Sequence, residues 1–136
     1  MAIIEIENIK KSFDTIEVLK QITFDVNTND VIAVIGPSGS GKSTMLRCLV
    51  DLEKIDGGSI RVCGEDLVKD GHYSQAQKIK QITTKMGMVF QHFNLFPHLT
   101  VKENIELAPK LVKKESAATI QERSIKTLEK DRKSVV

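Results

Sequence analysis

The chain has 136 residues, a formal net charge of +2 and 28% charged residues, enough length for one domain with a hydrophobic core. The nearly balanced charge gives no electrostatic signal for nucleic-acid binding, and no apolar run is long enough for direct insertion into a membrane. The first residues carry acids and no basic start, unlike a signal peptide, so a cytosolic location follows by default.

Apolar periodicity predicts the elements of the first third of the chain. Residues 4–9 and 22–26 largely alternate apolar with polar side chains, which is typical of strands with one buried face. Residues 31–35 form a continuous apolar run, which predicts a strand buried on both faces. Residues 42–52 have apolar side chains at helical spacing, so we expect a helix there.

A phosphate-binding motif connects this expected strand to this expected helix. Its residues are Gly36, Pro37, Ser38, Gly39, Ser40, Gly41, Lys42, Ser43 and Thr44. The glycines let successive backbone N–H groups point at phosphate oxygens, and the helix adds the positive end of its dipole. Lys42 is expected to reach the β- and γ-phosphates and the Ser43 hydroxyl to hold Mg²⁺. The sequence therefore predicts a site for a nucleoside triphosphate with magnesium.

The second half alternates short elements with polar connections. A glycine turn precedes an expected short strand at 59–63, and the polar segment 70–82 predicts a linker with a short helix. Residues 86–90 form another apolar run that predicts a strand, followed by a loop over 91–99. Thr100 to Glu103 has the pattern of a helical capping box.

Three further residues carry local expectations. Pro109 should kink or interrupt the helix that follows the capping box. Cys48 and Cys63 lie among apolar residues and have no metal-ligand spacing. We therefore expect two buried, reduced thiols.

Several motifs together resemble the ATP-binding subunits of ABC transporters, from about residue 3 to about residue 111. Residues 89–105, VFQHFNLFPHLTVKENI, resemble the Q-loop region of that family. The aromatic residue at position 13 and the run Gly57-Gly58-Ser59-Ile60 also occur in the order along the chain that the family has. The string HFNLFPH is most similar to importers of polar amino acids, although Lys102 stands where an apolar residue is more usual.

The resemblance implies an incomplete α/β fold. It would be the P-loop NTPase core of an ABC ATPase, with an N-terminal antiparallel β-subdomain and the start of a helical subdomain. We expect residues 1–130 to form a partial ATP-binding domain, with 1–99 as the β-subdomain and P-loop core and 100–130 as the start of the helical subdomain. Residues 131–136 do not resemble the family and read as translated sequencing-adapter DNA, a non-native tail. A genuinely shortened or frameshifted gene is the alternative.

The resemblance also implies roles for residues outside the loop, with ATP and Mg²⁺ as cofactors. Phe13 would stack on adenine, with Val18 as a nearby apolar contact; a surface or core phenylalanine is the alternative. Gln91 would coordinate Mg²⁺ or orient water and couple the nucleotide to a transmembrane subunit; the alternative is a solvated loop glutamine. Lys42 and Gln91 would thus be the catalytic residues within this chain.

Phe93, Leu95 and Phe96 are three large apolar residues in an expected loop. They are consistent either with a core or with an exposed patch that docks on a helix of a membrane subunit. The sequence alone leaves both interpretations open.

The groups that cleave ATP in this family are absent from the sequence. The family's Leu-Ser-Gly-Gly-Gln signature, its apolar strand ending in Asp-Glu and its switch histidine do not occur in these residues. We therefore expect this chain alone not to hydrolyse ATP. We also expect it to be at best marginally folded by itself, because an apolar strand such as 31–35 needs partner strands.

The leading functional prediction is the N-terminal half of an ATP-hydrolysing subunit of a polar amino-acid importer. The intact protein would work with a transmembrane permease subunit and a second ATP-binding subunit, on the cytoplasmic face of the plasma membrane and without inserting into it. One alternative is a non-hydrolysing nucleotide-binding module that competes for partners. Another is an ATPase of a different ABC class, such as one acting in DNA repair or translation.

Overall fold

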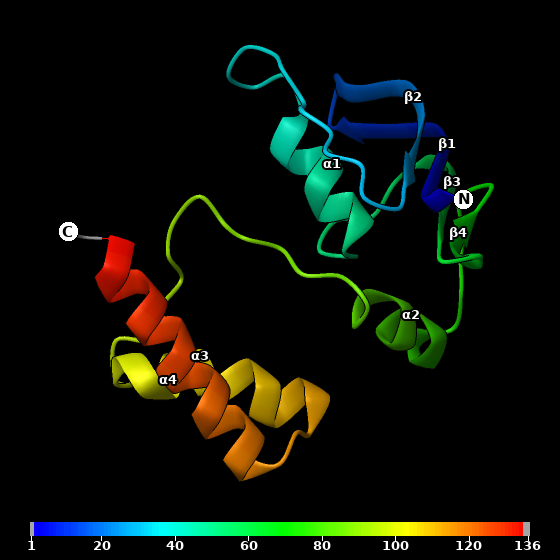
Figure 1. The fold of residues 1–136 in the computed structure, drawn as a ribbon. Helices are drawn as coiled ribbons and strands as arrows, with labels where there is room; N and C mark the ends of the chain where they lie inside the picture. Colours follow the sequence, from blue (N-terminus) through cyan, green and yellow to red (C-terminus); the bar gives the residue numbers. More distant parts are fainter. Residues whose placement is uncertain (1, 135–136) are drawn as a thin grey trace. The chain divides into compact units, whose positions relative to one another are not determined.

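The computed structural model describes residues 2–134 and divides into two compact units, Met1–Met88 and Val89–Val136 (Figure 1). Among the described residues, no helix combines the length and the apolar character needed to cross a bilayer. The sequence-based domain boundaries at residues 99 and 130 stay predictions.

The first unit is built on a five-stranded antiparallel sheet in the order β2-β1-β3-β4-β5. The strands are β1 (Ala2–Phe13), β2 (Ile16–Asn27), β3 (Gly57–Val62), β4 (Glu65–Lys69) and β5 (His72–Tyr73). Two helices accompany the sheet, α1 (Lys42–Leu49) and α2 (Ala76–Thr83). The predicted antiparallel β-subdomain is therefore confirmed, including the strands expected at 4–9, 22–26 and 59–63.

The core of this unit joins the apolar face of the sheet to α1. Ile6 of β1 pairs with Ile60 of β3, and both side chains are almost fully buried. Met45, Cys48 and Leu49 project from α1 into the same hydrophobic cluster. Each fully buried side chain of this size contributes about 1.5–3 kcal/mol through removal of apolar surface from water. This packing fixes the start of α1, and thus the phosphate-binding motif, against the sheet.

The prediction of a buried strand at 31–35 is wrong. The structure assigns no strand there, and Val31 and Ile35 are 97% and 93% exposed. The expected strand at 86–90 is also absent, with Val89 96% exposed. An apolar run becomes a buried strand only where neighbouring strands satisfy its backbone groups. Within the described residues 2–134, no strand pairs with either run.

The second unit contains α3 (Val101–Ala108), the π-helix η1 (Pro109–Lys113) and α4 (Ala117–Ser134). The capping box is confirmed: the Glu103 N–H donates to Thr100 Oγ1 at 3.2 Å, and the Thr100 N–H donates to Glu103 Oε2 at 2.7 Å. The Thr100 N–H and the Thr100 hydroxyl both donate to the Glu103 carboxylate, and they hold its pKa below its ordinary value. The α-helix gives way to η1 at Pro109, as predicted from the missing proline N–H.

The end of α4 includes the first part of the expected non-native tail. Residues 131–134 continue the helix, and residues 135 and 136 lie outside the described residues. The non-native origin of residues 131–136 stays a prediction.

The two cysteines differ from each other, so the expectation of two buried thiols is wrong for Cys63. Cys48 on α1 is fully buried, and burial raises the pKa of its thiol to about 11. Cys63 is exposed because it lies in the tight turn between β3 and β4, where its backbone has φ 50°. Its apolar neighbours in the sequence belong to strands that face the core, whereas the turn does not.

We expect alkylation at pH 8 to separate these thiols. Iodoacetamide should modify Cys63 rapidly and Cys48 slowly, because Cys48 is protonated at this pH and shielded from solvent. Mass spectrometry of peptides over a time course measures both rates. Equal rates in the folded chain would contradict the burial of Cys48, and denaturant should make the rates converge.

Candidate nucleotide-binding site

The motif at 36–44 forms an exposed loop that runs into the first turn of α1 (Figure 1). Gly39 and Gly41 have φ of +78° and +88°, in the left-handed region that glycine adopts without strain. Gly36, Pro37, Ser38, Gly39, Ser40 and Ser43 are exposed, Lys42 and Thr44 are half-buried, and Gly41 is buried. The structure thus keeps the predicted motif together as one solvent-facing loop.

The Lys42 side chain folds back over this loop. Its ammonium donates to the carbonyl oxygens of Gly36 and Pro37, both at 2.7 Å, and to Ser40 Oγ at 3.4 Å. The Ser40 N–H also donates to the Pro37 carbonyl at 3.3 Å. A positive charge is therefore held at the centre of the loop by neutral acceptors, and no carboxylate among the described residues is bonded to it.

The start of α1 is open to an anion. No side chain caps the helix, and its first turn contains no acidic residue. The first N–H groups of an α-helix have no partner within the helix, and they attract negative charge together with the helix dipole. These N–H groups, the two left-handed glycines and the Lys42 ammonium form a donor set that fits a polyphosphate.

Val18 of β2 lies directly against the loop. The pairing of β1 with β2 steps from Lys11↔Leu19 to Ser12↔Glu17, so β2 has Val18 as an extra residue, as in a β-bulge. A Cβ atom on Gly41 would lie only 2.7 Å from Val18 Cγ1 and 3.0 Å from the Val18 carbonyl oxygen. The structure therefore brings together Val18 and the motif, two features predicted independently.

Phe13 lies at the end of β1 and is 42% exposed. Phe13 is therefore not a core residue. The Lys11 ammonium lies over the ring, 4.8 Å from its centroid.

Gln91 is an exposed residue of the second unit, in the loop before α3. Its expected role toward magnesium stays a prediction, because the phosphate-binding loop belongs to the first unit.

A cluster of charged residues behind Phe13 was missed by the sequence analysis. Lys11 Nζ lies 2.8 Å from Glu53 Oε1 and 3.7 Å from Asp56 Oδ1. The hydrogen bond with Glu53 raises the pKa of Lys11 and lowers the pKa of Glu53. The only local signal was a lysine two residues before an aromatic, because both acidic partners lie more than forty positions along the chain.

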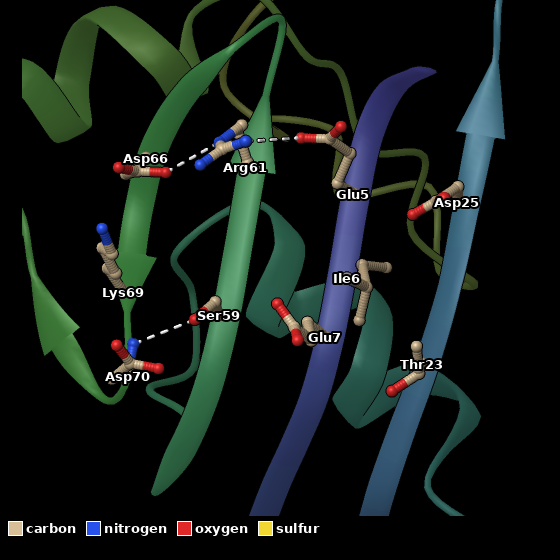
Figure 2. Close-up of a pocket in the computed structure, with 10 residues that line it drawn as sticks. All are labelled: Glu5, Ile6, Glu7, Thr23, Asp25, Ser59, Arg61, Asp66, Lys69 and Asp70. Carbon is tan, nitrogen blue, oxygen red and sulfur yellow. Dashed lines mark hydrogen bonds and ion pairs between the residues drawn. The ribbon is translucent and has the colours of Figure 1, made fainter. Parts of the chain in front are cut away.

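The polar face of the sheet has a hollow of about 500 Å³, which does not suit a triphosphate (Figure 2). Five carboxylates line it, against the two cations Arg61 and Lys69. Arg61 is already paired with Glu5 at 3.3 Å and Asp66 at 2.9 Å. The excess of negative charge would repel phosphate, so the loop at the start of α1 remains the candidate site.

The glycine loop and the helix that begins at its lysine are the features that define the class of P-loop proteins. Residues 19–135 match the family described as ABC transporter, and the chain belongs to this family. The fold is similar to two dimeric structures of the ATP-binding cassette MJ0796. One, described as a post-hydrolysis state bound to ADP and phosphate, has a TM-score of 0.79 at 28% identity, covering 93% of this chain and 56% of that chain. The other, described as a bacterial ABC transporter cassette, has a TM-score of 0.76 at 33% identity, covering 93% of this chain and 54% of that chain. The predicted fold class, a partial ABC ATPase, is thereby confirmed.

Curated relatives have names that refer to amino-acid transport. The chain is 49% identical to the arginine transport ATP-binding protein ArtM of Bacillus subtilis, covering 93% of this chain and 51% of that protein. It is 47% identical to the general L-amino acid transport ATP-binding protein AapP of Rhizobium johnstonii, covering 82% of this chain and 41% of that protein. The predicted resemblance to amino-acid ABC transporter subunits is confirmed, and the chain spans about half the length of the curated relatives it matches.

Proposed function

We propose that this chain is the ATP-binding part of a subunit that powers an ABC importer of polar amino acids. The observation that carries the proposal is the Lys42 ammonium, held over the loop at 2.7 Å from the carbonyl oxygens of Gly36 and Pro37, beside the uncapped start of α1. The cation, the loop and the start of the helix belong to one largely exposed segment, which supports polyphosphate binding. The names of the relatives, each an ATP-binding protein for amino-acid transport, support the choice of nucleotide and cargo.

Each site residue has a distinct proposed role. The backbone of residues 36–41 surrounds the phosphates, Lys42 neutralises the β- and γ-phosphates, and Ser43 and Gln91 hold Mg²⁺. Thr44 contributes its N–H in the first turn of the helix. Phe13 stacks on adenine through its π-face, and Val18, which lies against Gly41, adds an apolar contact beside the loop.

Hydrolysis belongs, in this proposal, to the intact protein. Mg²⁺ would supply charge neutralisation for phosphoryl transfer, and Lys42 and Gln91 are the residues of this chain that we propose to assist. The signature motif, the Asp-Glu strand and the switch histidine are not among these 136 residues. We therefore infer that the chain binds ATP without turning it over.

The second unit supports a proposed contact with a transmembrane permease subunit at the cytoplasmic face of the membrane. Phe93 and Leu95 are 91% and 66% exposed, so they are not core residues here. An apolar hollow of about 280 Å³ lies beside them, lined by Leu95, Phe96, Pro97, Leu99, Val101, Asn104 and Ile105. Asn104 holds the loop in place, because it accepts from the Phe96 N–H at 2.8 Å and donates to the Leu99 carbonyl at 3.1 Å. A second ATP-binding subunit is the other proposed partner, and both solved structures of the cassette MJ0796 described above are dimeric.

Calorimetric titration with ATP and Mg²⁺ tests the proposal. We expect saturable binding to the 136-residue chain and no phosphate release above the uncatalysed background. Circular dichroism first confirms that the chain is folded. Absence of binding to the folded chain at millimolar ATP would refute the proposal, and turnover would refute the inactive-chain part of it. Co-purification of the intact protein with proteins of DNA repair, instead of a permease, would favour the other ABC class.

A further inference from the structure

We infer that Lys11 is a positioning residue for the base site: its ammonium covers one face of the Phe13 ring and leaves the opposite face for adenine. This inference rests on the proposed function, because it needs a nucleotide whose base stacks on Phe13. It adds a residue outside the phosphate-binding motif to the determinants of base binding.

The positions of the two side chains on β1 carry the first step. Lys11 and Phe13 are two residues apart on one strand, so their side chains project from the same side of the sheet. Lys11 Nζ lies 4.8 Å from the ring centroid, within the range of a cation–π interaction. The Lys11 side chain is 11% exposed, whereas Phe13 is 42% exposed. One ring face therefore has a buried partner while much of the ring remains accessible.

The second step is the anchoring of the ammonium by two carboxylates. Glu53 and Asp56, in the segment after α1, lie 2.8 and 3.7 Å from Lys11 Nζ. Asp56 also fixes the strand itself, because its Oδ2 accepts from the Ser12 N–H at 2.6 Å and its own N–H donates to the Lys10 carbonyl at 2.8 Å. The cation cannot swing away from the ring without losing its ion pair with Glu53, in which the lysine is buried and the carboxylate is half-buried.

The same segment connects the base site to the phosphate site. α1 begins at Lys42 in the phosphate-binding motif, and Glu53 follows its C-terminal end. The Leu52 and Glu53 N–H groups both donate to the Arg47 carbonyl, at 2.9 and 3.3 Å, so this segment is tied to the helix. Lys11 thus sets the aromatic ring relative to the helix that carries the phosphate loop.

The test compares ATP with inorganic tripolyphosphate, which has the phosphates but no base. Replacement of Lys11 by methionine keeps most of the length of the side chain and removes its charge. We expect Lys11→Met to weaken Mg-ATP binding about 5- to 30-fold, the range of a desolvated cation–π contact, and to leave tripolyphosphate binding within about twofold. Lys11→Arg should retain most of the ATP affinity.

Lys10→Met is the matched control, because Lys10 is the exposed neighbour on the other side of β1, and it should change neither affinity. Equal weakening of both ligands by Lys11→Met, or no change in either, would overturn the inference. If Lys11→Met does not fold, Glu53→Gln provides the second variant. It keeps the cation and removes the charge of the nearer of its two anchors, and an unchanged ratio of ATP to tripolyphosphate affinity would overturn the inference as well.

Failure of the proposed function gives a different pattern. In that case the wild-type chain binds neither ligand, or Phe13→Ala leaves the ratio of affinities unchanged. If wild-type binding and the Phe13→Ala effect are present and only the Lys11 effect is missing, the inference fails while the proposed function stands.

Discussion

Replacing Lys42 by alanine is expected to weaken Mg-ATP binding by about 10- to 100-fold. The ammonium is the only side-chain cation hydrogen-bonded within the described loop, and a charge-assisted hydrogen bond is worth about 1.5–3 kcal/mol. Removal should have little effect on folding, because the carbonyls of Gly36 and Pro37 that lose their partner belong to exposed residues. Isothermal titration calorimetry measures the affinity, and thermal denaturation checks the fold.

Lys20→Ala is the control for this substitution, since Lys20 is an exposed lysine of β2 outside the motif. It removes the same charge from the chain and should change the affinity by less than about twofold, because its ammonium is exposed and screened by salt, whereas Lys42 is bonded within the loop. If Lys42→Ala and Lys20→Ala had equal effects, Lys42 would act only through net charge, contrary to the proposed site.

Gly58→Ala is expected to destabilise the first unit by more than about 3 kcal/mol. Gly58 has φ +93°, and an added Cβ would lie 2.5 Å from the Asn8 carbonyl oxygen and 2.6 Å from that of Glu7. Both are backbone atoms of β1, so the clash cannot be relieved by rotating a side chain. Relief requires β3 to move away from β1, which disturbs the pairing that buries Ile6.

The Gly64→Ala variant separates the two causes of this destabilisation, which are the steric clash with β1 and the strain of a positive φ. Gly64 also has a positive φ, +77°, but a Cβ atom added there would have no neighbour within 4 Å among the described residues. Backbone strain alone should therefore cost about 1–2 kcal/mol there. Circular dichroism in water gives the folded fraction of each variant, and urea denaturation gives the free energy of unfolding of any variant that is folded. Equal values for the two variants would show that β1 does not approach Gly58 closely.

The elements that could be predicted from the sequence are those with local causes. The alternation around Ile6 specified a half-buried strand, and the Thr100–Glu103 pattern specified a helix start, because both depend on neighbours within a few residues. The phosphate-binding loop was predictable for the same reason. Its glycine positions, its lysine and the helix after it are contiguous in the chain.

The features that could not be predicted depend on distant partners. Residues 31–35 have the composition of a buried strand, but composition does not supply the neighbouring strands that such a strand needs. The role of Lys11 depends on Glu53 and Asp56, which α1 and the segment after it bring to β1. The exposure of Cys63 depends on a left-handed backbone position in a turn, which a run of apolar neighbours conceals.

The hydrogen bonds of Lys42 to the loop carbonyls have a kinetic and entropic consequence. Because the ammonium is already held over the loop, a phosphate that replaces one of its three hydrogen bonds does not have to immobilise a freely rotating lysine chain, whose ordering costs up to about 2 kcal/mol. The charge also sits on an exposed loop, where it attracts polyanions before contact. Association should therefore be fast and should slow as ionic strength rises, while dissociation should respond mainly to the contacts made with the base.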